Sequence, residues 1–187
     1  MRYDLKSFVE LECDGLDNIA NKTALYLERT VGFSKKEVPW IFLNLKEILS
    51  EIPEYVHYFK KHKLIPRGCA CTVLHGNLPL HIDALPVVAK MNFPILNTYG
   101  WSNKWYSYDT DILGSLPEKN DPLGLETLDV TSIKSEDLTL IAECANFNKP
   151  IILNSQQLHS VERTSDSIVP RVMMTFTFVN DPWELLK

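Results

Sequence analysis

The chain has 187 residues, of which 45% are hydrophobic, 10% aromatic and 23% charged. This composition is that of an ordinary globular protein and argues against disorder, and the length favours one domain over two. The formal net charge of −5 argues against a surface built to neutralise phosphates, because nonspecific nucleic-acid affinity comes from clustered lysine and arginine. We therefore do not expect a nucleic-acid partner.

The N-terminal stretch MRYDLKSFVELECDG lacks the apolar segment of a signal peptide. No run of residues approaches the roughly 18 apolar residues that span a bilayer. The four cysteines are scattered without a CxxC pair, so the sequence predicts neither a zinc cluster nor a disulfide framework. We expect a cytoplasmic protein that does not enter a membrane.

The first third of the chain is predicted to be helical. Apolar residues recur at helical spacing in three segments, 16–33, 38–52 and 53–63. Pro39 suits the first turn of the second segment. Each segment has a single apolar stripe, so the helices need a surface to cover.

After Pro66 the chain changes to short apolar runs separated by Gly, Pro, Asn and Asp, which is typical of a β-sandwich or small barrel. One more helix is predicted around 135–145. Helices followed by strands predict an α+β fold, with the helices on one face of the β-structure. Strands are expected near 68–75, 79–84, 88–97, 104–109, 124–130, 150–154, 158–162 and 171–179.

The last predicted strand, RVMMTFTFV, has two different faces. Side chains alternate along a strand, so the even-numbered positions from Val172 to Phe178 share one face and the odd-numbered positions from Arg171 to Thr177 share the other. The even face is apolar enough to pack under the helices. The odd face is mixed, as in the lining of a barrel that holds a ligand, and Arg171 begins it.

Two ionisable residues stand one position apart in the segment NLPLHIDALPVVAK. His81 and Asp83 are i and i+2 on a predicted strand, so both side chains emerge on one face, while Ile82 points towards the core. This geometry suits two ligands of one metal ion. Taken alone, a histidine hydrogen-bonded to a nearby carboxylate is the more ordinary explanation.

A third candidate ligand, His159, lies far downstream between an apolar strand and the mixed-face strand. Two histidines and one carboxylate can occupy one face of an octahedron and leave three positions open, as in non-haem Fe(II) oxygenases. A closed zinc site would want four ligands, preferably with cysteine. A bidentate 2-oxo acid can fill two open positions and O2 the last, and Arg171 is the fork-shaped cation that its distal carboxylate requires.

The pattern His81-x-Asp83, His159 and Arg171 resembles that of the Fe(II)/2-oxoglutarate-dependent dioxygenases. The stretches KMNFPILNTYGWSNKWY and ILNSQQLHSVER look like the aspartyl/asparaginyl and prolyl hydroxylase-like branch. The β-rich span from about 68 to 179 carries the resemblance. It implies one oxygenase domain over 1–187, with helical support at 1–65 and a double-stranded β-helix (jelly-roll) core at 66–180.

The resemblance also implies roles for particular residues. His81, Asp83 and His159 would bind Fe(II), and Arg171 would pair with the C5 carboxylate of the co-substrate 2-oxoglutarate, with Asn92 nearby.

Further candidates for the lining of the site are Lys90, Trp105 and Tyr106. Each also suits a simpler position, the lysine at the surface and the aromatic residues over the core. Met173 departs from the family pattern, which often has serine two residues after the arginine.

The implied activity is that of a dioxygenase (hydroxylase) that uses O2 and 2-oxoglutarate, hydroxylates an amino-acid or peptidyl side chain and releases succinate and CO2. The substrate would be a small molecule, a peptide or a protein, selected by loops at 98–125 and 154–170. One alternative is a cupin-type metal-binding jelly-roll without 2-oxoglutarate chemistry, which leaves Arg171 without a task. The other is a non-catalytic interaction domain in which His81 and Asp83 simply pair.

Overall fold

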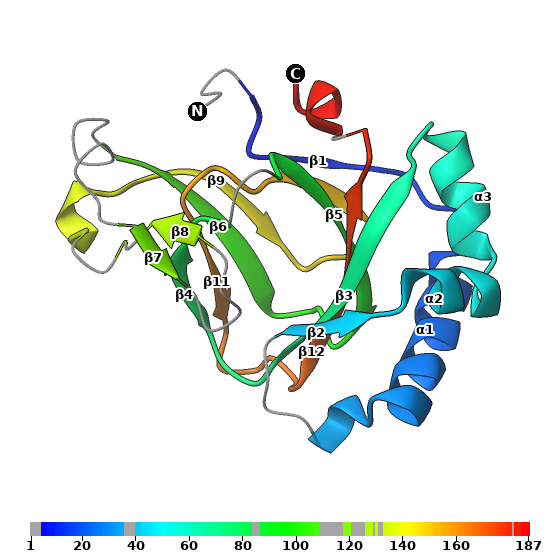
Figure 1. Cartoon of the computed structure of the whole chain (residues 1–187). Helices are drawn as coiled ribbons and strands as arrows, with labels where there is room; N and C mark the ends of the chain where they lie inside the picture. Colours follow the sequence, from blue (N-terminus) through cyan, green and yellow to red (C-terminus); the bar gives the residue numbers. More distant parts are fainter. Residues whose placement is uncertain are drawn as a thin grey trace.

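Two antiparallel sheets face each other, and helices lie on the outer side of the larger sheet (Figure 1). The computed structural model describes residues 5–35, 40–83, 87–108, 118–120, 126–128, 130, 133–180 and 182–187. The helices are α1 (Leu16–Thr30), α2 (Leu45–Glu51) and α3 (Glu54–Lys61), with 3-10 turns η1 (Phe33–Lys35), η3 (Ser135–Asp137) and η4 (Pro182–Leu186). The strands are β1 (Phe8–Glu10), β2 (Trp40–Leu43), β3 (Pro66–Leu74), β4 (Leu78–His81), β5 (Ala89–Leu96), β6 (Trp101–Ser107), β7 (Glu118–Asn120), β8 (Glu126–Leu128), β9 (Thr139–Ala145), β10 (Ile151–Asn154), β11 (His159–Arg163) and β12 (Arg171–Phe178).

The order of the strands brings distant segments side by side. Within the described ranges, the larger sheet has the order β1-β10-β5-β12-β3-β2 and the smaller one β4-β11-β6-β9, while β7 and β8 form a separate pair. From β3 to β12 the strands of these two sheets alternate between them, except that β6 and β9 are neighbours in one sheet. Both ends of this series, β3 and β12, therefore meet in the larger sheet, and β4 meets β11 in the smaller one.

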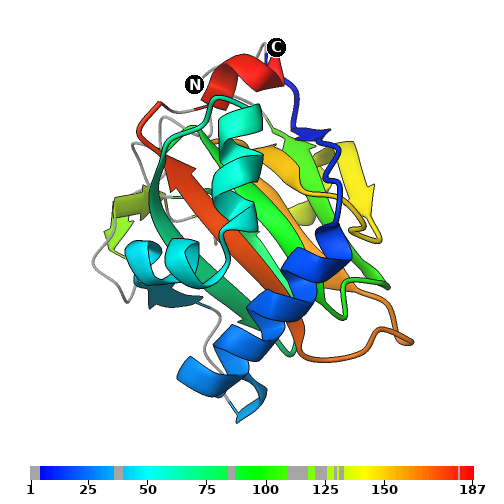
Figure 2. The same ribbon diagram turned by 90° about the vertical axis from the view of Figure 1, so that its right-hand side faces the viewer.

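The three helices cover the outer face of the larger sheet (Figure 2). The amide groups at the start of α2 are capped by Asn44, whose side-chain oxygen accepts hydrogen bonds from the backbone of the first turn. Aromatic residues of α3 pack on the sheet: the rings of Tyr55 and Phe93 have centroids 5.0 Å apart, and those of Phe59 and Phe176 4.9 Å apart. The helices thus seal one side of the sheet and leave the other side to the cavity described below.

The predicted two-faced character of the last strand is confirmed. The even-numbered residues from Val172 to Phe178 belong to the cluster under the helices, whereas Met173 belongs to a second cluster between the sheets, with Trp101 and Trp105. The α+β class is confirmed as well, and each of the three helical segments predicted in the first third contains a helix.

Two predicted helices are wrong. In the second predicted helix, 38–52, residues 40–43 form the strand β2, which pairs with β3, and only the part occupied by α2 is helical. Pro39 lies outside the described residues. The segment 135–145 is a 3-10 turn followed by β9, which pairs with β6 along its whole length. In both cases pairing with a strand distant in the sequence overrides local helix propensity.

The remaining predicted strands are present with shifted ends, and β1 and β7 were not predicted. Of the strand predicted at 124–130, residues 126–128 form β8, whereas 124, 125 and 129 lie outside the described ranges. The loop predicted at 98–125 begins with β6 and is described only in part. Among the described helices, none has both the length and the apolar character that crossing a bilayer requires.

Candidate metal centre

A cavity lies between the two sheets. Its polar lining comes from both of them: Thr72, His81, Lys90, Asn92, Asn103, His159 and Arg171. Alternation along each strand explains the placement, because the neighbours of these residues, such as Met91 and Val172, point to the helices instead.

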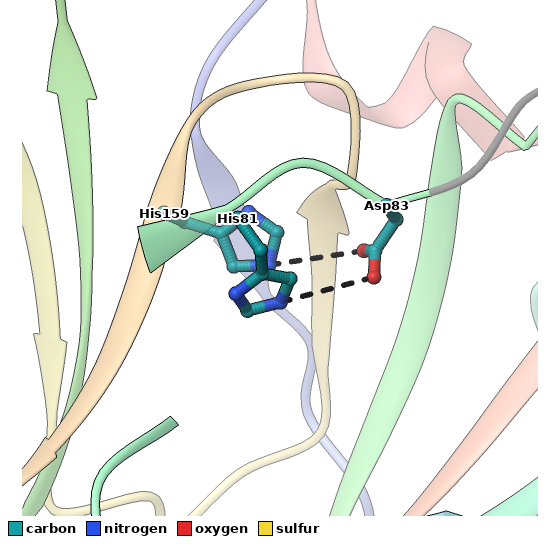
Figure 3. A group of neighbouring side chains, drawn as sticks. All are labelled: His81, Asp83 and His159. Carbon is teal, nitrogen blue, oxygen red and sulfur yellow. Dashed lines mark ion pairs between the residues drawn. The ribbon is translucent and has the colours of Figure 1, made fainter. Parts of the chain in front are cut away.

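The three predicted metal ligands lie close together (Figure 3), and two of them, His81 and His159, line the cavity. His81 is the last residue of β4 and is paired with His159, the first residue of β11. Asp83 lies beyond the end of β4, not on the strand as predicted, and its backbone N–H donates to the carbonyl of Ser155 at 3.0 Å. Ile82 is buried in a separate apolar cluster, which confirms its predicted orientation.

The donor atoms of the three side chains all lie within 4.8 Å of one another. The distance from His81 Nε2 to Asp83 Oδ1 is 3.9 Å, and that from His159 Nε2 to Asp83 Oδ2 is 3.7 Å. Metal–ligand bonds of about 2.0–2.2 Å place neighbouring donors about 3 Å apart, slightly closer than they stand here. The donor set therefore fits a divalent ion after a small inward movement.

Both imidazoles are held in the orientation that a metal ligand needs. His81 Nδ1 lies 2.7 Å from the carbonyl oxygen of Pro79, and His159 Nδ1 lies 2.8 Å from that of Gln157. A carbonyl only accepts, so each Nδ1 carries the proton and each Nε2 presents its lone pair. Such a hydrogen bond from the remote nitrogen is the usual support of a ligating histidine.

Burial keeps these imidazoles neutral at pH 7. It lowers the pKa of His81, and together with the neighbouring His81 ring it lowers the pKa of His159 to about 3. Burial is the largest single influence on Asp83 and by itself would raise its pKa, but Lys90, His159 and His81 together lower the pKa to about 2. Two neutral imidazoles and one carboxylate are the protonation states that bind a metal ion.

Lys90 also lines the cavity. Its Nζ is 2.5 Å from Asp83 Oδ2 and 5.0 Å from the ring centroid of Trp40. Of the two positions considered for Lys90, the structure has the one in the lining and not the one at the surface, and its partner is the carboxylate of the triad.

Arg171 is buried without an acidic partner. Its side chain lies against the rings of Phe147, at 4.6 Å, and Trp101, at 5.8 Å. One hydrogen bond, 3.4 Å long, reaches the side-chain oxygen of Asn103, and Nε has no partner in the described part of the chain. None of the ion pairs among the described residues includes Arg171. Burial lowers the pKa of Arg171 to about 9, so the guanidinium stays charged at pH 7.

The other predicted lining residues have different surroundings. Asn92 lines the cavity and accepts a hydrogen bond of 2.7 Å from the hydroxyl of Thr175. Trp105 is buried in the core beside the cavity, with its ring 6.3 Å from that of His159. Tyr106 is on the opposite face of β6, where its hydroxyl approaches Glu162 and its ring packs on an apolar cluster, so of the two positions considered for it the one in the lining is excluded.

Trp40 and Asn103 are among the cavity residues that were not identified from the sequence. Trp40 falls in a segment that is predicted to be helical but forms β2, and the predicted helix gives no indication that its side chain faces the cavity. Asn103 stands between Trp101 and Trp105 at alternate positions of β6. That period of two, which places all three on the inner face, was the signal that could have found it.

The metal-free protein is expected to lose stability in acid. The folded-state pKa of His159 is about 3, well below its ordinary value, so between these two values only the unfolded chain binds the proton. The contribution of His159 to the free energy of unfolding is therefore at its maximum above about pH 6.5. It falls by about 3 kcal/mol as the pH drops to about 4. Urea unfolding in EDTA across this range measures the effect. His159→Gln should flatten the dependence, and an unchanged slope in that variant would show that another group is responsible.

No protein-family model matches the chain, and no curated protein matches it in sequence. Solved structures do match it in fold. The epimerase SnoN, crystallised with Fe3+, alpha ketoglutarate and nogalamycin RO, is 9% identical with a TM-score of 0.59, and the match covers 94% of this chain and 79% of SnoN. HygX from Streptomyces hygroscopicus, with nickel and 2-oxoglutarate bound, is 11% identical with a TM-score of 0.52, covering 93% and 82%.

A third structure, the non-heme monooxygenase ThoJ in its apo form, is 12% identical with a TM-score of 0.51, and the match covers 95% of this chain and 76% of ThoJ. At such identities the similarity is one of fold. The chain thus has the overall fold of proteins whose structures include iron- and 2-oxoglutarate-bound examples.

Proposed function

We propose that the chain is an Fe(II)- and 2-oxoglutarate-dependent oxygenase. The observation that carries the proposal is Arg171, a buried guanidinium without an acidic partner among the described residues, in the cavity that the triad histidines His81 and His159 also line. An unpaired buried charge is unfavourable, so a cavity that keeps one is suited to an anionic ligand. Many metal ions fit two histidines and one carboxylate, whereas the guanidinium specifically favours a carboxylate or phosphate.

In this proposal, His81, Asp83 and His159 hold Fe(II), and Arg171 pairs with the C5 carboxylate of 2-oxoglutarate. Fe(II) and 2-oxoglutarate supply the oxidising chemistry: O2 reacts with the co-substrate to give succinate and CO2, and the second oxygen atom enters a C–H bond of the substrate. The chain's own part is to bind and orient. The carbonyls that hold each Nδ1–H keep the Nε2 atoms directed at the ion, and Arg171 fixes the far end of the co-substrate.

We propose further that β3 to β6 and β9 to β12 form a double-stranded β-helix (jelly-roll), in a single domain with the helices as support. The alternation of successive strands between the two sheets supports this topology. It also accounts for the site, because the strands that carry His81 and His159 become neighbours only when the chain folds back on itself in this way.

The finer assignment is hydroxylation of an amino-acid or peptidyl side chain, as in the aspartyl/asparaginyl or prolyl hydroxylase-like branch. It rests on the sequence resemblance at 90–106 and 152–163. A cupin-type protein without 2-oxoglutarate is the less favoured alternative, since it gives the buried Arg171 no role.

The first experiment measures succinate formed from 2-oxoglutarate under air by the purified chain with added Fe(II). Slow turnover without a substrate is expected, and it should require Fe(II), 2-oxoglutarate and O2 together. Absence of succinate, with no binding of 2-oxoglutarate to the metal-loaded protein, would refute the proposal.

A second experiment addresses the substrate. Incubation with free amino acids and peptides should stimulate succinate release and give a product heavier by about 16 Da, the mass of one oxygen atom. A product of unchanged mass would point instead to an isomerisation, a distinction suggested by the name of SnoN as an epimerase.

A further inference from the structure

Lys90 is a buried cation placed on a metal ligand. Its side chain is 8% exposed, and its Nζ lies 2.5 Å from Asp83 Oδ2. The same oxygen is the one that faces His159 Nε2, at 3.7 Å. In this structure the ammonium group is therefore the positive charge that the triad's carboxylate contacts.

A divalent ion and this ammonium compete for one carboxylate. A metal ion that bonds to Asp83 Oδ2 at about 2.0–2.2 Å takes up the oxygen that the ammonium group now contacts. The two positive charges would also repel each other strongly, since little water screens them in the cavity. An ion that bonds through Oδ2, the oxygen that faces His159 Nε2, therefore breaks or weakens the contact between Lys90 and Asp83, and that cost lowers the affinity of the site.

We propose that Lys90 is an internal competitor of the metal ion, which balances Asp83 in the metal-free protein and is displaced when the ion binds. The ring of Trp40, whose centroid is 5.0 Å from Nζ, gives the ammonium a favourable neighbour during this exchange.

The displaced ammonium gains a second role. It remains at the cavity, which Arg171 and Asn92 also line, and has lost its counter-charge. A buried ammonium without a partner is unfavourable, so an anionic ligand in the same cavity restores the balance. Lys90 thereby couples metal binding to anion binding, and each should favour the other.

The test is a calorimetric titration of the metal-free protein with Mn2+, an air-stable substitute for Fe(II), in the absence and presence of 2-oxoglutarate. Lys90→Met removes the charge and keeps the length of the side chain. It should bind Mn2+ alone about tenfold more tightly than the unmodified chain, or better. The further gain in Mn2+ affinity on adding 2-oxoglutarate should be smaller in the variant.

Lys104→Met is the matched control. Lys104 also pairs with a carboxylate at 2.5 Å, that of Glu162, but on the outer face of the smaller sheet. Its removal should leave Mn2+ affinity unchanged. Lys90→Gln is the second charge-removing variant, and thermal unfolding with and without Mn2+ should show a larger stabilisation by the ion in both Lys90 variants than in the unmodified chain.

Equal or weaker Mn2+ binding by the Lys90 variants would overturn the competition and make Lys90 a support of Asp83. An unchanged gain from 2-oxoglutarate would overturn the coupling. The inference rests on the proposed function only in needing a metal at the triad. If Mn2+ binding follows the expected pattern but no succinate forms, the oxygenase proposal fails while the role of Lys90 stands; if no variant binds Mn2+, both fail.

Discussion

Replacing Asp83 with alanine is expected to lower the affinity for Mn2+ by about a hundredfold or more, as measured by calorimetry. The substitution removes the one charged donor of the triad, and loss of a mere supporting group already costs about 10–100-fold in other metal sites. Uncoupled formation of succinate should disappear with the metal. Glu162→Ala, which breaks the Lys104 pair on the outer face of the sheet, should bind Mn2+ as the unmodified chain does.

The same substitution has a second consequence for folding. Without Asp83 the ammonium of Lys90 is buried and unpaired, so the free energy of unfolding should fall by about 3–5 kcal/mol. The double variant Asp83→Ala with Lys90→Met removes both charges and should recover most of that loss while still failing to bind Mn2+. Restored metal binding in the double variant would contradict the assignment of Asp83 as a ligand.

Replacing Arg171 with methionine is expected to weaken binding of 2-oxoglutarate to the metal-loaded protein by about a hundredfold, because a buried charge-assisted contact contributes about 2–5 kcal/mol. Binding of Mn2+ alone should hardly change, since the contacts of Arg171 among the described residues are with Asn103, Phe147 and Trp101 and not with the triad. The metal-free variant should also be at least as stable as the unmodified chain in urea, because a buried cation without a partner opposes folding.

Arg163 provides the control for this substitution. It also lies near the ring of Trp101, at 6.0 Å, but it is partly exposed and donates a hydrogen bond to the carbonyl of His75. Arg163→Met should leave the affinity for 2-oxoglutarate unchanged. If Arg171→Met did the same, the guanidinium would not be the carboxylate-binding group, and the cupin-type alternative would gain support.

The results expected for the Asp83 and Arg171 variants share a cause, which is the presence of two buried cations at the cavity. Among the described residues nothing balances the charge of Arg171, and the ion pair given for Lys90 is with a carboxylate that a metal ion would take. Both cations therefore make the empty cavity less favourable than an apolar core would be. This is the pattern expected of residues kept for a ligand and not for folding.

Local signals in the sequence were sufficient for much of the fold. Alternation of apolar and polar residues predicted both faces of β12, and helical spacing predicted α1 and α3. The residue types and spacing of His81, Asp83 and His159 identified a group that the structure brings within 4.8 Å, because these signals lie in short stretches that strand geometry then orients.

What local signals could not determine depends on partners far away in the chain. The segments of β2 and β9 have helix-compatible sequences and became strands because β3 and β6 present unpaired edges to them. Likewise, the contact of Lys90 with Asp83 and the burial of Arg171 between two rings arise only when the two sheets close over the cavity. Residue types and local spacing were thus enough to indicate which residues could form the site. Which charges are paired there and which remain for a ligand depends on the closed sheets, because burial and counter-charges arise between strands and not within any one of them.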